Sequence, residues 1–304
     1  MTRVIPTREF SLYSLGAPGP AAIEVCPLPF SPARYSRYKY GSVAAAVTFA
    51  RALGAAFCER RPELALAPRL LMTSSPYGHV PAAATTLARM LQPVLNDVRT
   101  SHGLARAPLL QVDRISASAG DYGTLSAQAR DLHMAANALS FRRFRLEQVR
   151  DAHLLVIDDV RVTGAHQRCL MRATEDLPLA AQIFLYIGAF TRPATGSVDP
   201  AQEDALNHAA VKTLDDLAGI VEAGDFAWNV RVCKFVLNPA NYGELPGFLR
   251  RMPGWFVRGL HRNSCRDGYA RMDLYAQSHA AVRAELTRRG GMPRAACSPA
   301  RQPA

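Results

Sequence analysis

The stretch "HLLVIDDVRVTGAHQ", residues 153–167, decides the fold. Four apolar residues run directly into two adjacent acids, Asp158 and Asp159. A short turn that contains Thr163 and Gly164 follows, and the chain then continues into a helix-like segment. A short apolar run bounded by turn signals is typical of a buried strand. The sequence therefore predicts a buried strand that ends on two carboxylates.

The rest of the chain alternates strand-like and helix-like segments, and "LLMT" within residues 69–73 is a second short apolar run. Strands separated by helices indicate βαβ units and a parallel sheet. We therefore predict an α/β fold, with a parallel sheet flanked by helices. Further strands are expected at 109–115, 181–190 and 229–237. Helices are expected at 42–58, at 81–96, after Gly164 and at 201–222. Pro93 should bend or shorten the second of these helices.

Composition excludes several classes of protein. The chain has 304 residues, of which 49% are apolar, so one large domain or two smaller ones can form a substantial core. Its six cysteines are scattered without a C-x-x-C pair, which argues against a zinc site or a disulfide framework and fits a reducing cytoplasm. The N-terminus has no signal-peptide core, and no apolar run approaches the roughly 18 residues of a membrane span. We expect a soluble, cytoplasmic protein without a membrane partner.

The positive charge is concentrated toward the C-terminus. The net charge is +11, and residues 226–304 hold 13 basic and 4 acidic residues. Almost all of the basic residues are arginine, which holds phosphate and carboxylate groups in a bidentate fork. An arginine-biased composition with a solvated face is an equally good explanation.

The two acids at the end of the strand suggest a specific ligand. In an open parallel sheet, ligands bind beyond the carboxyl ends of the strands. Alternation along the strand points Asp158 and Asp159 to opposite sides, where carboxylates can accept hydrogen bonds from vicinal hydroxyls or orient water around Mg²⁺. The following helix N-terminus can bind an anion, and Gly164 permits close approach. These features together predict a ribose-5-phosphate site, the alternative being two solvated turn residues.

The run "LLVIDDVRVTGAH" resembles the phosphoribosyl pyrophosphate (PRPP) motif of type I phosphoribosyltransferases, a resemblance that covers roughly residues 30–225. Within that family the chain is most similar to the enzymes encoded beside tellurite-resistance and stress genes, and more loosely to the competence-type enzymes. The resemblance implies that Asp158 and Asp159 hold the ribose hydroxyls. It also implies a 5-phosphate loop formed by Val162, Thr163, Gly164, Ala165 and His166, although the family usually has Thr or Ser where this chain has Val162 and His166.

The resemblance locates two further loops by their position along the chain. The pyrophosphate loop would be formed by Ser74, Ser75, Pro76, Tyr77 and Gly78, although "SSPYG" also fits a simple turn. The family's flexible loop would span residues 113–133, with Arg114, Tyr122 and Arg130 as candidate contacts. Mg²⁺ would be held through the bound ligand and water near Asp158 and Asp159.

Two other positions are ambiguous from sequence. Lys39, in "YSRYKYGS", either lines the acceptor side of the site or caps the following helix. Asp215 and Asp216 form a second acid pair, but they fall inside a predicted helix, where a solvated face is the simpler interpretation.

The chain divides into four segments on this interpretation. An N-terminal extension (1–30) and a basic C-terminal extension (226–289) would form a hood or cover on a phosphoribosyltransferase-like core (31–225), followed by a disordered tail (290–304). We interpret residues 231–271 as a cover rather than a nucleic-acid groove because they supply so much apolar surface, namely Leu245, Phe248, Leu249, Met252, Trp255, Phe256 and Leu260.

The sequence thus predicts an enzyme that uses Mg²⁺ and PRPP to transfer phosphoribose to a base or another nitrogen acceptor, with release of pyrophosphate. Two alternatives remain open. One is a regulator that senses PRPP or a nucleotide and binds nucleic acid through residues 226–304. The other is a related hydrolase or phosphorolytic enzyme. The acceptor is not identified, and a homodimer is left open.

Overall fold

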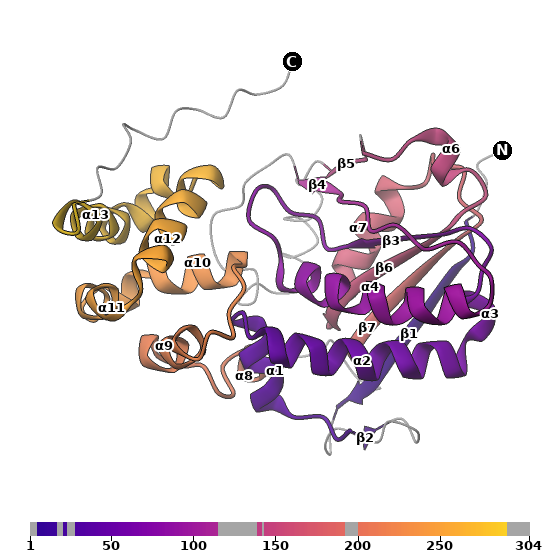
Figure 1. Cartoon of the computed structure of the whole chain (residues 1–304), viewed down its shortest axis with the longest axis horizontal. Helices are drawn as coiled ribbons and strands as arrows, with labels where there is room; N and C mark the ends of the chain where they lie inside the picture. The colour runs from indigo at the N-terminus through magenta and orange to yellow at the C-terminus, as the bar shows by residue number, and fades with distance from the viewer. Residues whose placement is uncertain are drawn as a thin grey trace.

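A computed structural model describes residues 5–16, 21–22, 28–114, 139–141, 143–191 and 200–290. Figure 1 shows a sheet covered by helices and, to one side of it, a group of helices formed by the C-terminal part of the chain. The predicted disordered tail falls outside the described residues beyond Gly290.

The main sheet has the strand order β2-β1-β7-β6-β3. Its four longer strands run parallel to their neighbours, and only β2 is antiparallel. The predicted α/β fold with a parallel sheet is therefore confirmed. Strand bounds are Thr7–Leu15 (β1), Ala21–Ala22 (β2), Leu70–Ser74 (β3), His153–Arg161 (β6) and Ala181–Phe190 (β7).

Alternating side chains of the sheet build two cores. On β6, Leu155 and Ile157 pack in the core with the helices on one face, whereas Leu154 and Val156 pack in the core on the other face. Because β7 lies between β1 and β6, all ten of its residues are buried. The first face is covered by α1 (Pro32–Lys39), α2 (Val43–Arg60), the short α3 (Pro62–Ala65) and α4 (Ala83–Ser101), the second by α6 (Leu146–Val149) and α7 (Ala165–Ala173) (Figure 1).

A third core lies among the C-terminal helices. It is formed mainly by residues 211–286, and Tyr40 and Val80 from the sheet-bearing part of the chain join it. The helices of this core are α9 (Leu214–Glu222), α10 (Val230–Leu237), α11 (Leu245–Arg251), α12 (Gly254–Arg266) and α13 (Asp273–Arg288), with single 3₁₀ turns η2 (Pro239–Asn241) and η3 (Tyr269–Arg271). The preceding helix α8 (Pro200–Asn207) lies beside α1, and its Leu206 packs against the core on the first face of the sheet.

The strand predicted at 229–237 is wrong, because this segment is helix α10. Asn229 caps the helix, its Oδ1 accepting a hydrogen bond from the amide of Val232 at 3.0 Å. The buried residues are Val232, Cys233, Val236 and Leu237, which is helical spacing. The β-branched composition favoured a strand, but the packing of these positions overrides it.

The predicted helix at 201–222 is two helices, α8 and α9, because Thr213 starts a new one. The Thr213 side chain accepts a hydrogen bond from the amide of Asp216, and Asp216 accepts one from the amide of Thr213. This reciprocal cap fixes a helix start inside the predicted segment. Pro93 does not shorten α4, which continues to Ser101.

The strand predicted at 109–115 forms only in part. Residues 108–110 run beside β3 through one isolated bridge, between Leu109 and Met72, and through hydrogen bonds. Within the described part of the segment only β4 (Asp113–Arg114) is a strand, paired with β5 (Leu139–Ser140). Pro76 has no N–H to donate, so a regular ladder between this segment and the chain after β3 is interrupted.

Residues 7–15, which we placed in an N-terminal extension, form β1 and pair with β7 along nearly its whole length. Among the described residues, no single helix is long and apolar enough to cross a membrane, and α1 and α2 meet the length and composition test only as a pair bent by 118°.

Candidate functional site

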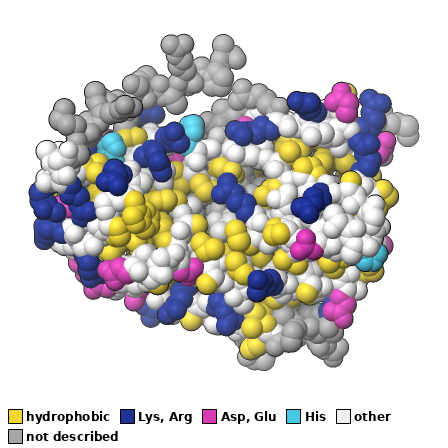
Figure 2. Space-filling view, viewed as in Figure 1, with side chains coloured by type: hydrophobic (Ala, Val, Ile, Leu, Met, Phe, Trp, Pro, Cys, Tyr) yellow, Lys and Arg dark blue, Asp and Glu magenta, His cyan; other side chains and the backbone are white. Residues whose placement is uncertain are grey.

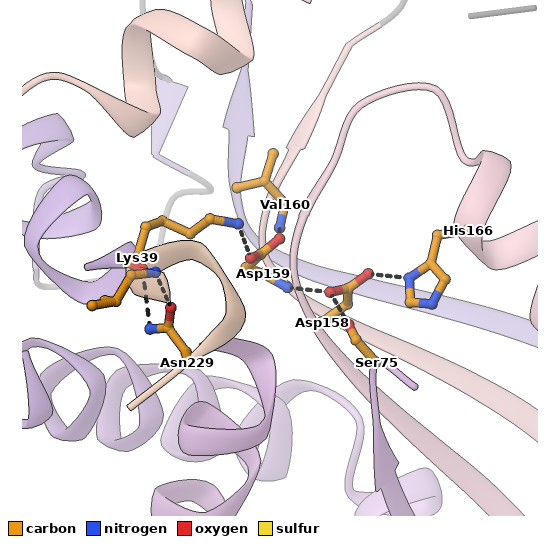
Figure 3. A network of polar contacts seen from close by, with 8 residues as sticks. Lys39, Ser75, Asp158, Asp159, Val160, His166 and Asn229 are labelled. Carbon is orange, nitrogen blue, oxygen red and sulfur yellow. Dashed lines mark hydrogen bonds and ion pairs between the residues drawn. The ribbon is translucent and has the colours of Figure 1, made fainter. Parts of the chain in front are cut away.

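The two acids at the end of β6 point to different faces of the sheet, as the alternation of the strand requires. Asp158 follows the side of Val156 and meets His166 of α7, with 2.7 Å between Oδ2 and Nδ1. Asp159 follows the side of Ile157 and forms an ion pair with Lys39, the last residue of α1. Each acid thus has its own basic partner from the helix that covers its face (Figure 3).

Asp158 lies in a dense set of hydrogen-bond donors. Besides His166, its carboxylate accepts hydrogen bonds from the Ser75 hydroxyl at 2.6 Å and from the amide of Asp159 at 2.9 Å. Burial alone would raise the pKa of Asp158, but the pKa lies below its ordinary value because the charge of His166 and the hydrogen bonds from His166, Ser75 and the Asp159 amide outweigh burial. Asp158 is therefore held as a carboxylate.

His166 uses one of its two ring nitrogens for Asp158. The other, Nε2, is buried and has no hydrogen-bond partner among the described residues. The side chain as a whole is 19% exposed but this nitrogen is covered, so a ligand reaches it only when the imidazole shifts. His166 can thus hold Asp158 and still offer Nε2 to a ligand.

The Lys39–Asp159 pair is tied to the C-terminal helices. The Lys39 carbonyl accepts a hydrogen bond from the side-chain amide of Asn229, the cap of α10, at 3.1 Å. The Asp159 carboxylate also accepts a bond from the amide of Val160 at 2.7 Å. Lys39 does not cap α2, because Ser42 does, accepting a bond from the Ala45 amide at 3.1 Å. Of the two interpretations of Lys39, the helix cap is excluded.

The turn after the acids begins α7 at Gly164, whose φ of 73° is a left-handed conformation that favours glycine. Thr163 lies before it, and its hydroxyl accepts a bond from the Ala165 amide at 3.3 Å. Val162 is 6% exposed and packs in the core, which explains an apolar residue where the family has a hydroxyl. Within the described part of the chain the amides of His166 and Gln167, in the first turn of α7, have no hydrogen-bond partner and can bind a ligand in this position.

The loop after β3 lies beside the same end of β6. Ser74 is buried and shares a hydrogen bond with Thr85 of α4 at 3.0 Å, so it is directed away from the acids, whereas Ser75 bonds to Asp158. The Tyr77 amide donates to the Val112 carbonyl at 3.3 Å. Of the serines expected in a pyrophosphate loop, only Ser75 is brought to the acids. Pro76 and Gly78 complete the turn.

A residue that sequence reasoning missed closes this loop. Asp267, just after α12, accepts hydrogen bonds at Oδ1 from the amides of His79 (2.8 Å) and Val80 (3.2 Å). The same oxygen would lie 3.2 Å from a Cβ built on Gly78, so the loop passes close to the carboxylate. Burial raises the pKa of Asp267 although the two amides act against the increase. Sequence gave no signal for this contact, because it joins positions almost 190 residues apart.

The remaining candidates fall into three groups. Arg114 is in β4, where its amide donates to the Tyr77 carbonyl at 3.1 Å, so it lies beside the loop after β3. Tyr122 and Arg130, with most of the predicted flexible loop, lie outside the described residues. Asp215 and Asp216 are in the first turn of α9, where Asp216 caps the helix and Asp215 forms an exposed pair with Arg251.

The acids fit Mg²⁺ only when the metal enters with a ligand. Carboxylate and hydroxyl oxygens are the donors that Mg²⁺ prefers, and Asp158, Asp159 and Ser75 supply them. Both carboxylates, however, already have a basic partner in Lys39 or His166. The residues therefore fit a metal coordinated by phosphate oxygens and water that the acids orient, and not a metal held by the protein alone.

Comparison with known proteins places the chain in a family. No curated protein matches the chain. Among solved structures, a hypothetical protein from Neisseria gonorrhoeae crystallised with bound ppGpp aligns over 55% of this chain and 93% of its own, at 11% identity and a TM-score of 0.29. The model of the PRTase ComF-like family matches residues 7–281, which include β1 and most of the C-terminal helices as well as the segment on which the sequence resemblance was based. The chain therefore belongs to the PRTase ComF-like family of phosphoribosyltransferase-type proteins.

Proposed function

We propose that the protein is a phosphoribosyltransferase-like enzyme that uses Mg²⁺ and PRPP to transfer phosphoribose to a nitrogen acceptor. The observation that supports this most strongly is the arrangement at the end of β6, where two diverging carboxylates stand next to the amide-bearing start of α7. A sugar diol and a phosphate on the same molecule need this combination, because hydroxyls donate to carboxylates and phosphate accepts from amides.

PRPP would bind in the following way. Its ribose 2- and 3-hydroxyls donate to Asp158 and Asp159, and its 5-phosphate accepts from the amides after Gly164. Lys39 and His166 each supply a basic partner to one of the two carboxylates before the ligand arrives. In the imidazolium form, with Nδ1 donating to Asp158, His166 Nε2 also carries a proton that it can donate to a phosphate oxygen.

The reaction breaks one bond and forms another. The bond between ribose C1 and the pyrophosphate oxygen breaks, and its electron pair leaves with pyrophosphate. The acceptor nitrogen forms the new bond to C1 and loses its proton. When bound, Mg²⁺ would neutralise the charge of the leaving pyrophosphate. The chain contributes positioning and charge: the acids orient the ribose, and the loop from Ser75 to Val80 lies where pyrophosphate departs.

A tellurite-resistance or stress setting and a cytoplasmic location belong to this proposal and rest on the sequence resemblance and composition. The regulator that binds nucleic acid is less favoured. On the face seen in Figure 2, Lys and Arg side chains are scattered among hydrophobic and acidic ones. Phe256 and Tyr269, two of the aromatic residues that could have stacked on bases, are buried in the C-terminal core, whereas Trp255 and Tyr242 are exposed, at 45% and 37%.

The test of the activity is to incubate the protein with Mg²⁺, PRPP and a panel of nitrogen bases while pyrophosphate release is measured. Release that depends on one class of base supports the transferase and identifies its acceptor. Release without any base indicates a hydrolase. PRPP binding without release across the panel, together with salt-dependent binding of RNA or DNA, supports the regulator instead.

The test of the site is calorimetry of Mg²⁺–PRPP binding to Asp158→Asn and Asp159→Asn. Each variant loses a charged acceptor worth about 1.5–3 kcal/mol, so we expect affinity to fall about 10-fold or more. Asp215→Asn, which removes an acid from the other adjacent pair, is the matched control and should bind like the unmodified chain. Unchanged affinity in both site variants, with melting curves that show folded protein, would refute the site.

Because Asp159→Asn leaves the Lys39 ammonium without its partner, a double variant is needed as a second measurement. Lys39→Met combined with Asp159→Asn removes both charges of the pair together. If the site is correct, the double variant should fold and still bind PRPP more weakly than the Asp215→Asn control.

A further inference from the structure

A second group of chemically reactive side chains lies away from the acid pair, between α12 and α13. His261 and Cys265 are four residues apart on α12 and therefore share one face of the helix. His279 of α13 faces them. The Cys265 sulfur is 3.8 Å from Nε2 of each histidine, and the three atoms all lie within 4.8 Å of one another.

The two imidazoles are held in place by packing. Their rings stack with 5.2 Å between centroids and 19° between planes. His279 is only 7% exposed, and Val282 and Leu286, on the same helix, belong to the C-terminal core. The two Nε2 atoms thus approach the same sulfur from two rigid helices, which is how preorganised metal sites are built.

The sulfur in this group has two mutually exclusive chemical forms. In this structure Cys265 is disulfide-bonded, and a disulfide sulfur is not a thiolate ligand. Reduction by a thiol reductant transfers two electrons and two protons to the disulfide and oxidises two reductant thiols to their own disulfide. The released Cys265 thiol can then lose its proton on binding a metal. Sequence spacing argued against both a zinc site and disulfides, because the ligands come from two helices and form no local motif.

We propose that His261, Cys265 and His279 form a thiol-gated site for a borderline-soft cation of the Zn²⁺ class. Imidazole nitrogen and thiolate sulfur are both donors that Zn²⁺ binds, and with three protein ligands water completes the coordination. Small inward movements of the side chains are enough, since N and S ligands bind Zn²⁺ at about 2.0–2.3 Å. The alternative is a packed group held together by weak S···N contacts.

The surrounding charge makes the thiolate essential. Arg283 lies four residues after His279 on α13, so it shares the helix face of that imidazole and its positive charge opposes a dication bound there. A thiolate supplies the one negative charge of the ligand set. Loss of the sulfur should therefore abolish binding, whereas loss of one imidazole should weaken it.

The site has a structural link to the loop after β3. Asp267, which holds the amides of His79 and Val80, lies two residues after Cys265 at the end of the same helix. A metal that fixes the end of α12 against α13 would thus also fix the carboxylate that holds the loop.

The experiment uses Co²⁺, a spectroscopic probe for Zn²⁺ sites, titrated into the full chain after reduction and anaerobic removal of the reductant. We expect one Co²⁺ per chain, with a sulfur-to-cobalt charge-transfer band and the visible bands of tetrahedral cobalt. Excess Zn²⁺ should displace the Co²⁺. Unreduced protein should bind at least 10-fold more weakly and without the charge-transfer band.

Variants separate the site from incidental binding. Cys265→Ser should abolish the charge-transfer band, and His261→Gln, at a half-exposed position, should weaken Co²⁺ binding at least 10-fold. Cys58→Ser, at a half-buried free cysteine on α2, is the control and should behave like the unmodified chain. Circular dichroism confirms that each variant is folded. Absence of Co²⁺ binding by reduced protein, or a charge-transfer band that persists in Cys265→Ser, would overturn the proposal.

Discussion

At the scale of single residues, the acid pair is defined by its partners. Asp158 and Asp159 are each about 15% exposed, and a carboxylate this deep is costly unless a cation and hydrogen bonds compensate it. His166 and Lys39 provide that compensation from opposite faces of the sheet. When a diol binds, the Asp158–His166 and Asp159–Lys39 pairs must either break or share their carboxylate oxygens with the hydroxyls. The strength of these two pairs therefore affects the affinity of the acids for a ligand.

His166→Ala should raise the pKa of Asp158. Without the imidazole, burial is opposed only by the Ser75 hydroxyl and the Asp159 amide. In the unmodified protein the lowered pKa stabilises the fold above the ordinary aspartate value of about 3.9, and this contribution disappears as the pH falls through the lower folded value. The variant should therefore be less stable at neutral pH, by about 3 kcal/mol, and the difference should shrink in acid.

Carboxyl NMR titration and urea unfolding from pH 7 to pH 2 measure both effects. His208→Ala is the matched control, because His208 forms its pair with Asp204 on an exposed helix surface. It should change stability by less than about 1 kcal/mol. A pKa of Asp158 that stays unchanged in His166→Ala would mean that the imidazole does not hold the carboxylate.

Glu285 gives a second pH prediction, far from the acids. The pKa of Glu285 is lowered to about 2. Hydrogen bonds from Arg288 are the largest cause, and together with those from Arg289 they outweigh the effect of burial, which would raise the pKa. Arg289 in turn donates to carbonyls at the end of α11, Leu249 at 2.6 Å and Met252 at 2.9 Å. Glu285→Gln should cost about 1–3 kcal/mol at neutral pH, and the cost should disappear as the pH falls from about 4.5 toward 2.

The measurement is chemical unfolding across that pH window. Glu63→Gln is the control, since Glu63 also pairs with an arginine but has a 58% exposed side chain. Its effect at neutral pH should be small. If the cost of Glu285→Gln is the same at pH 2.5 as at pH 7, the ionised carboxylate is not what links α13 to α11.

At the scale of elements, local patterns predicted some parts of the fold and missed others. The sequence predicted strand β6, strand β7 and helix α2 because each has its apolar pattern, a buried run or a helical stripe, within one continuous segment. The opposite directions of Asp158 and Asp159 also followed from strand alternation alone. Strand β1 was missed, since its burial depends on pairing with β7, about 175 residues away.

The partners of the acids show the same limit. The sequence marks Lys39 only as a base among tyrosines, and nothing local places it beside Asp159. Asp267 was missed for the same reason. Each contact joins elements that come together only when the sheet and the C-terminal helices pack against each other. A single sequence carries no signal for such a tertiary contact.

Asp267 connects two elements, and its removal should release the loop after β3. Asp267→Ala takes away the acceptor of the His79 and Val80 amides. Two amides that lose hydrogen bonds to a charged group, each worth about 1.5–3 kcal/mol, should exchange their hydrogens at least 10-fold faster. Amide exchange by NMR measures this directly.

The control for that experiment is Asp216→Ala, which also removes an acid that accepts backbone amides, but at the start of α9. It should speed exchange at Lys212 and Thr213 and leave the loop unchanged. Equal protection of His79 and Val80 in Asp267→Ala and the unmodified chain would show that the carboxylate does not hold the loop.

At the scale of the whole molecule, the C-terminal helices and the sheet are joined through the site. Asn229 holds the Lys39 carbonyl, Asp267 holds the loop after β3, and Tyr40 and Val80 are buried in the C-terminal core. In Figure 1 these helices stand beside the sheet rather than over its faces. The basic C-terminal segment thus supports the candidate site from one side.

This arrangement predicts the outcome of truncation after residue 225. The cut would leave α9 in place but remove the helices that bury it. The side chains left without cover are Tyr40, Val80, Val211, Leu214, Leu217, Ile220 and Val221. Burial of one large apolar side chain is worth about 1.5–3 kcal/mol, so the loss is on the order of 10 kcal/mol, comparable with the whole stability of a typical domain.

We therefore expect the chain that ends at residue 225 to be insoluble or to unfold without cooperativity. A chain that ends at Ala209 is the matched comparison, because it removes α9 together with its partners and leaves mainly Tyr40 and Val80 uncovered. The fragment that ends at Ala209 should be more soluble than the fragment that ends at residue 225. If solubility depended only on how much of the chain is kept, the longer fragment would be the more soluble one. Expression, sedimentation and thermal unfolding of the two fragments measure this.

A chain ending at residue 225 that is soluble, unfolds cooperatively and binds PRPP, but no longer retards RNA or DNA, would contradict the supporting role of these helices. That result would favour the regulator that binds nucleic acid over the transferase.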